Sequence, residues 1–156
     1  IGGDPPVYAD IRGEAAWARF AAEMIEDARA MAAAGGFEAA GGATVDAITR
    51  AVESPVVLAA VEEEPGYVNT DLKAAHVFVL ADGYKVLDWQ RPIRGPAALD
   101  RATLLRSLGV DPLGHVAPGV LTLQSLLRIA WFAACDRRWI GPGYGAAIVR
   151  LAGALG

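Results

Sequence analysis

The sequence is poor in the residues that build disulfides and metal cages. Among 156 residues it has one cysteine, Cys135, and two histidines, His76 and His115. A single thiol can form neither an intrachain disulfide nor a cysteine-based metal cage. We therefore expect the chain to work in a reducing compartment, the cytoplasm.

Positive charge and long apolar runs are also scarce. The 14 Lys and Arg residues are outnumbered by 18 Asp and Glu residues, which gives a net charge of −4. This is the wrong sign for a surface that collects nucleic-acid phosphates. The longest apolar region, 119–135, is interrupted by Gln124 and Arg128 and falls short of the roughly 20 apolar residues that cross a bilayer. We expect neither a nucleic acid nor a membrane as a partner.

The composition is that of a folding chain. Hydrophobic residues make up 54% of the sequence and charged residues 21%, which excludes intrinsic disorder as a description of the whole. The length suits one hydrophobic core and is too short for two independent ones. We find no repeat and no dividing linker, so residues 1–156 are predicted to form a single domain.

Apolar spacing predicts helices over most of the chain. Apolar residues at three- and four-residue steps indicate an amphipathic helix over 14–34. A second helix is expected from Thr44, as N-cap, to about residue 52, and a short one from Ser54 and Pro55 to the acidic run 62–64. Later helices are expected over 97–108, 119–138 and 143–155.

Strand signals are confined to the middle of the chain. The apolar runs 76–80 and 84–89 are separated by Ala81, Asp82 and Gly83, and Asp-Gly between such runs is typical of a hairpin. Residues 90–96 are expected to be an extended connector. The sequence therefore predicts a mainly helical α+β fold with one small β-hairpin.

Three polar residues bracket this hairpin. Asp71 precedes it, His76 enters it and Asp88 leaves it, so the hairpin can bring two carboxylates and an imidazole to one end. Such a group suits divalent-metal binding and general-base catalysis. Spacing alone favours plainer roles: Asp71 as a turn residue, His76 as a core histidine and Asp88 as a cap on a bend.

A longer pattern runs through these residues. Residues 68–79, VNTDLKAAHVFV, and 86–89, VLDW, resemble the catalytic loop and the metal-binding strand end of the aminoglycoside phosphotransferase family, small-molecule relatives of the protein kinases. The family pattern reads His-Gly-Asp-Leu-x-x-x-Asn, followed by a turn and an apolar pair before Asp-Trp or Asp-Phe. Residues 95–102, GPAALDRA, resemble its downstream Gly-Asp-Pro-x-x-Asp-Leu-Ala segment.

The resemblance implies a role for each matching residue. Asp71 would be the catalytic base, Asp88 would hold magnesium against the nucleotide phosphates, and His76 would stand at the second metal-ligand position. Asp100 would brace the catalytic loop by accepting hydrogen bonds from its backbone. Lys73 stands where protein kinases often carry a lysine that contacts phosphate.

Two positions depart from the family pattern. Asn69 replaces the first histidine, whose role is loop support, and His76 replaces the asparagine. Magnesium prefers oxygen ligands, whereas imidazole suits transition metals, so Mn²⁺ is an alternative to Mg²⁺. The sequence also has no glycine-rich loop after a strand and no strand lysine to cover the nucleotide phosphates. It therefore resembles the C-terminal lobe alone, with the N-terminal nucleotide-binding lobe missing.

The resemblance implies an ATP- or GTP-dependent phosphotransferase that acts on a hydroxyl of an antibiotic, a sugar or a related metabolite. We expect the segment alone to be inactive. One alternative is a catalytically inactive kinase-like scaffold or binding module, which Asn69 and His76 favour. Another is a helical interaction domain with a chance motif, in which Asp71 and Asp88 would lie far apart.

Overall fold

Helices form most of the structure. The computed structural model of the chain describes residues 6–140 and 142–155. Its α-helices are α1 (Glu14–Ala33), α2 (Gly41–Val52), α3 (Pro55–Val61), α4 (Ala98–Ser107), α5 (Pro118–Ala134) and α6 (Gly145–Gly153). Short 3-10 turns cover Glu38–Ala40 and Ala74–His76, and a π-helical segment, Cys135–Trp139, extends α5.

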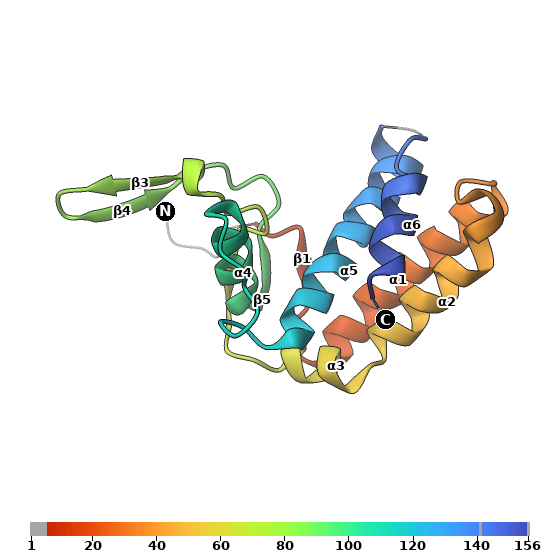
Figure 1. Cartoon of the computed structure of the whole chain (residues 1–156), viewed down its shortest axis with the longest axis horizontal. Helices are drawn as coiled ribbons and strands as arrows, with labels where there is room; N and C mark the ends of the chain where they lie inside the picture. The colour runs from red at the N-terminus through yellow and green to blue at the C-terminus, as the bar shows by residue number, and fades with distance from the viewer. Residues whose placement is uncertain (1–5, 141, 156) are drawn as a thin grey trace.

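The strands form two separate sheets. In the first, β5 (Ile93–Pro96) lies between β1 (Ala9–Asp10), to which it is parallel, and β2 (Pro65–Val68), to which it is antiparallel. In the second, β3 (Val77–Leu80) and β4 (Gly83–Val86) form an antiparallel hairpin. Figure 1 shows the helices α1, α2, α3, α5 and α6 gathered on one side, α4 and the first sheet beside them, and the hairpin projecting from the other side.

The predicted α+β class is confirmed, as is the hairpin. Most of the predicted helices are present with ends that differ by a few residues. The second helix differs in its start, because α2 begins at Gly41 directly after a 3-10 turn, and Thr44 is a buried residue inside it rather than its N-cap. The hairpin strands are also shorter than predicted: β4 ends at Val86, and residues 87–89 lie beyond it.

Ser54 and Pro55 begin α3, as their order predicts. Ser54 has an extended backbone with φ −68° and ψ 139°, and Pro55 occupies the first helical turn. The Ser54 hydroxyl donates to the carbonyl of Ala51 at 2.9 Å instead of capping α3, so it ties α3 to the end of α2. The helix ends at Val61, before the acidic run that was expected to close it.

The expectation that the hairpin supplies the only strands is wrong. Part of the predicted connector, Ile93–Pro96, is the central strand of the first sheet, and Ile93 is buried. Gly95 lets this strand pack closely, because a Cβ there would lie 2.8 Å from the Ile11 side chain. The sequence pattern does not predict this strand, because it contains proline and glycine, and both residue types are rare in strand interiors.

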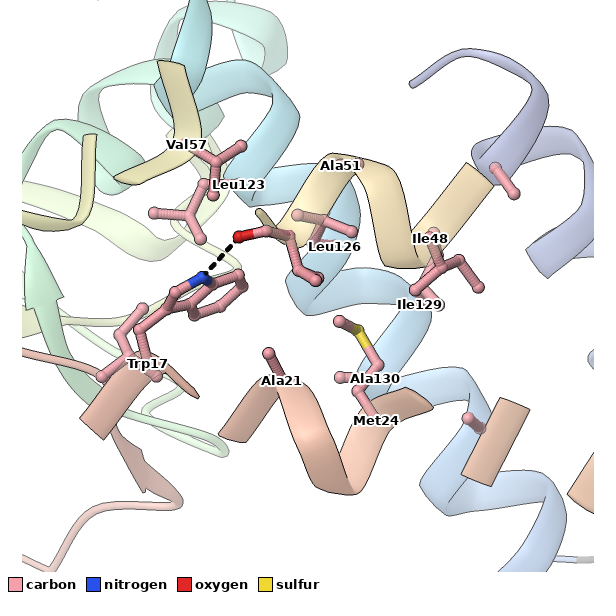
Figure 2. Packing of buried hydrophobic residues seen from close by; sticks show 14 of the residues in the cluster. Trp17, Ala21, Met24, Ile48, Ala51, Val57, Leu123, Leu126, Ile129 and Ala130 are labelled. Atoms are coloured by element: carbon pink, nitrogen blue, oxygen red, sulfur yellow. Dashed lines mark hydrogen bonds between the residues drawn. The ribbon is translucent and has the colours of Figure 1, made fainter. Parts of the chain in front are cut away.

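The helical core is built around α5. Buried side chains from α1, α2, α3 and α5 meet there, and the indole nitrogen of Trp17 donates to the carbonyl of Val52 at 3.0 Å (Figure 2). This bond gives the buried indole its partner and fixes the start of α1 against the end of α2. Within the described residues, Pro118–Arg138 is the one helical stretch that is long and apolar enough to cross a membrane by length and composition. Its most apolar window is 56% buried inside the structure, which is also typical of a core helix.

Helices α3 and α5 approach so closely that only glycine fits at their contact. A Cβ on Gly119 would lie 1.9 Å from the carbonyl oxygen of Val56. Gly42 is the second residue of α2, as Gly119 is of α5, but a Cβ there would meet nothing within 4 Å. The two glycines therefore form a matched pair for testing the packing.

We predict that Gly119→Ala lowers the free energy of unfolding by about 2–3 kcal/mol, because the helices must separate to admit the methyl group. Gly42→Ala should change it by less than about 1 kcal/mol, in the stabilising direction, because alanine has the higher helix propensity. Urea denaturation followed by circular dichroism measures both. Equal effects of the two substitutions would contradict this packing of α3 on α5.

Candidate functional site

The loop between β2 and the hairpin is attached to helix α4 by a carboxylate. The backbone N–H of Asn69 donates to Oδ2 of Asp100 at 2.7 Å, and the N–H of Thr70 donates to Oδ1 at 3.0 Å. Asp100 stands in the first turn of α4. Burial raises the pKa of Asp100, and the two backbone hydrogen bonds act in the opposite direction. The loop-bracing contacts expected of Asp100 are present.

Asn69 joins the two ends of the hairpin region. Its side chain is buried, with 1% of the residue exposed. Its Nδ2 donates to the backbone carbonyl of Asp88 at 3.1 Å, and its Oδ1 accepts from the backbone N–H of Asp71 at 3.0 Å. One amide group therefore fixes the backbones of both aspartates, a task that needs a side chain with a donor and an acceptor.

Two residues of this region have left-handed backbones. The φ angle is 69° at Thr70 and 62° at Asp88, a region that non-glycine residues rarely adopt. Thr70 is held there by its N–H bond to Asp100 and by its hydroxyl, which donates to the carbonyl of Arg91 at 3.2 Å. Such strain costs of order 1–3 kcal/mol at each residue and occurs most often at functional sites.

His76 and Asp88 face each other at the base of the hairpin. Nε2 of His76 lies 3.6 Å from Oδ2 of Asp88, which is too long for a hydrogen bond. Nδ1 of His76 is buried and has no hydrogen-bond partner among the described residues. The two backbones are tied as well, because the N–H of Leu87 donates to the carbonyl of His76 at 2.9 Å.

Asp71 and Lys73 form a second pair. Nζ of Lys73 lies 2.8 Å from Oδ2 of Asp71, and both side chains are partly exposed. No group of three or more His, Cys, Asp or Glu side chains that could hold a metal is found in the described part of the chain. The four predicted site residues therefore come together as two pairs, His76 with Asp88 and Asp71 with Lys73, connected through Asn69.

A large cavity lies next to the second pair. It has a volume of about 850 Å³ and is bounded by the loop segment 70–75, the start of β5, and helices α4 and α5. Asp71 and Lys73 line it, whereas His76 and Asp88 are not among its described lining residues. The Asp71 and Lys73 pair thus borders the cavity, and the His76 and Asp88 pair does not.

Sequence reasoning missed much of this cavity. Arg91, which follows Asp88 closely in the sequence, is a lining residue. Arg106 on α4 and Arg128 on α5 were not singled out from the sequence. A signal was present, because Gln124 and Arg128 interrupt the apolar α5 four residues apart and so share one face of that helix.

The comparisons with known proteins give no match: no protein-family model, no curated protein and no solved structure matches the chain.

We predict that Asp100→Ala accelerates amide hydrogen exchange at Asn69 and Thr70 and lowers the free energy of unfolding by about 1–3 kcal/mol. Both amides lose their acceptor, and the one at Asn69 is buried. Exchange monitored by NMR checks the first effect and urea denaturation the second. Asp111→Ala, which removes a single exposed turn contact to Leu113, is the control and should leave both amides as they are. Unchanged exchange at Asn69 and Thr70 in Asp100→Ala would contradict the bracing.

Proposed function

We propose that this chain is the C-terminal lobe of a phosphotransferase, which moves the γ-phosphoryl group of ATP or GTP to a hydroxyl of a small molecule. The observation that carries the proposal is the Asn69 side chain, which fixes the backbones of Asp71 and Asp88 together. Phosphoryl transfer needs a carboxylate beside the attacking oxygen and a metal against the phosphates, held in a fixed relation. The Asn69 linkage supports such a relation.

Asp71 is the proposed base. It lines the cavity, where an acceptor can place a hydroxyl beside its carboxylate. In the proposed step the acceptor oxygen bonds to the γ-phosphorus while the bond from that phosphorus to the β,γ-bridging oxygen breaks. The hydroxyl proton passes to Asp71, and the nucleoside diphosphate leaves.

Asp88 and His76 are the proposed holders of a divalent ion. Metal bonds to carboxylate oxygen or imidazole nitrogen are about 2.1 Å long, so neighbouring ligands of an octahedral ion lie about 3.0 Å apart. The two side-chain atoms, at 3.6 Å, would move closer by about half an ångström to hold one ion. Magnesium bound through one or two protein ligands takes its other positions from water and phosphate, so two side chains are enough. The imidazole favours Mn²⁺ over Mg²⁺. The ion would neutralise charge on the phosphates.

The exposed side chains of the hairpin region are an argument for the proposed second lobe. Its apolar side chains are unusually exposed: Val79 is 85% exposed and Tyr84 75%, and Phe78, Leu87 and Trp89 are about half exposed. The hairpin projects from the rest of the chain (Figure 1), Val79 pairs with Tyr84 on one of its faces, and Phe78 lies on the other. Exposed apolar side chains of this kind mark a surface for a partner. We propose that the nucleotide base and an N-terminal lobe cover it.

Two alternatives differ in what they require. A chance motif requires Asp71 and Asp88 to lie far apart, and the Asn69 linkage argues against it. An inactive kinase-like scaffold requires the same fold without metal–nucleotide binding. It is favoured by His76, which offers nitrogen where the family pattern offers oxygen.

We predict that the complete gene product hydrolyses or transfers the γ-phosphate of ATP or GTP, and that Mn²⁺ supports this better than Mg²⁺. Asp71→Asn and Asp88→Ala should each lower turnover by about 10²-fold or more, because one removes the base and the other a metal ligand. Release of nucleoside diphosphate, measured with each metal in turn, checks this.

The matched control is Asp46→Asn, an exposed position on α2 that belongs neither to the cavity lining nor to the hairpin, and it should leave turnover unchanged. If a folded complete protein neither binds nor hydrolyses either nucleotide with either metal, the enzyme proposal fails and the scaffold alternative takes its place.

A further inference from the structure

The cavity beside Asp71 has a strong excess of positive charge. Its charged lining residues are Asp71, Lys73, Arg91, Arg106 and Arg128. Lys73 is paired with Asp71, the only acid in this set. The three arginines have no carboxylate within 4 Å among the described residues. This local surplus contrasts with the net charge of −4 of the whole chain.

Neutral groups orient two of these arginines, Arg91 and Arg106. The guanidinium of Arg91 lies 4.0 Å from the ring centre of Trp131. Nη1 of Arg106 donates to Oε1 of Gln124 at 2.5 Å, and Nε2 of Gln124 donates to the hydroxyl of Thr103 at 2.6 Å. These contacts hold the side chains in place and leave their charge uncompensated. Each guanidinium has five N–H donors, so most of the donors stay available to a ligand.

The remaining wall of the cavity is largely apolar. Leu99 comes from α4, and Leu127, Trp131 and Phe132 come from α5. A small molecule with a ring or carbon chain can pack on this wall while its anionic group meets the guanidiniums. Arginine suits carboxylate and phosphate groups because its planar fork binds two of their oxygens at once.

The nucleotide is a less suitable occupant of the cavity. Its proposed metal ligands, His76 and Asp88, are not among the described lining residues, whereas the proposed base Asp71 is. The arginines therefore lie on the side of Asp71 where the acceptor would bind.

We propose that the acceptor is an anionic hydroxy compound, with a carboxylate or phosphate group bound by Arg91, Arg106 and Arg128 and a hydroxyl directed to Asp71. This inference deepens the proposed phosphotransferase function and rests on it. It also excludes polycationic aminoglycosides as the substrate class, because three uncompensated guanidiniums repel them.

Binding to the complete protein without nucleotide tests the inference independently of turnover. The probes are gluconate and glucose 6-phosphate as anions, glucose as the neutral analogue and kanamycin as a polycation, each titrated by calorimetry. We expect at least one anion to bind about tenfold or more tightly than glucose, with affinity that falls as salt rises. Kanamycin should not bind. If gluconate binds more tightly than glucose 6-phosphate, the site is a carboxylate site. The reverse order indicates a phosphate site.

Arg106→Gln and Arg128→Gln should each weaken anion binding by about tenfold, because a charge-assisted hydrogen bond is lost. Arg101→Gln, an exposed residue of α4 that does not line the cavity, is the matched control and should have no effect. Circular dichroism establishes that each variant is folded.

Tighter binding of glucose or kanamycin than of both anions overturns the inference. So does anion binding that the arginine variants leave unchanged, or displacement of the anion by Mg²⁺–ADP, which would assign the cavity to the nucleotide. Failure of the two proposals can be told apart. Anion binding without phosphoryl transfer removes the proposed function and leaves the anion site, whereas transfer to kanamycin removes only the anionic acceptor.

Discussion

The candidate site depends on the hydrogen bonds of a single buried amide. Asn69 lies between the N–H of Asp71 and the carbonyl of Asp88, so its two bonds set the backbone relation between the proposed base and the proposed metal ligand. Asp100 fixes the loop from the other side through two backbone amides. Together these four bonds hold Thr70 and Asp88 in left-handed conformations that an unsupported loop would leave.

The helical core gives this loop a rigid support. Helix α5 packs against α1, α2, α3, α4 and α6, and the close approach at Gly119 places α3 directly on its first turn. The same helix carries Gln124, Arg128 and Trp131 on the cavity side. The side chains that shape the cavity therefore stand on the best-packed element of the structure, as precise positioning of a ligand requires.

Local signals in the sequence were enough for the helices and the hairpin. Amphipathic spacing predicted α1, and Ser54 followed by Pro55 predicted the start of α3. The first sheet was not predictable in this way. Strand β1 has two residues, and β5 has a glycine that matters only because Ile11 lies against it. Its pairing is decided by contacts between distant segments, which no local pattern records.

The candidate site likewise has features that the local sequence predicted and features that depend on distant segments. The resemblance in the hairpin region selected Asp71, His76 and Asp88 and predicted the contacts of Asp100 with the loop. It did not predict that Asn69 would use both ends of its amide, because that depends on the backbone of Asp88, 19 residues away. The cavity arginines come from the segment just before β5, from α4 and from α5, and only the fold brings them together.

In the proposed site, Asn69 holds the metal ligands and the base together in one centre. Paramagnetic broadening by Mn²⁺ in the complete protein with ATP, read from backbone amide NMR signals, tests it most directly. We predict selective, ATP-dependent broadening around His76, Asp88 and Asp71, which Asp88→Ala abolishes while the variant remains folded. Broadening elsewhere, or around His76 and Asp88 without any effect at Asp71 in the unmodified protein, would contradict this arrangement.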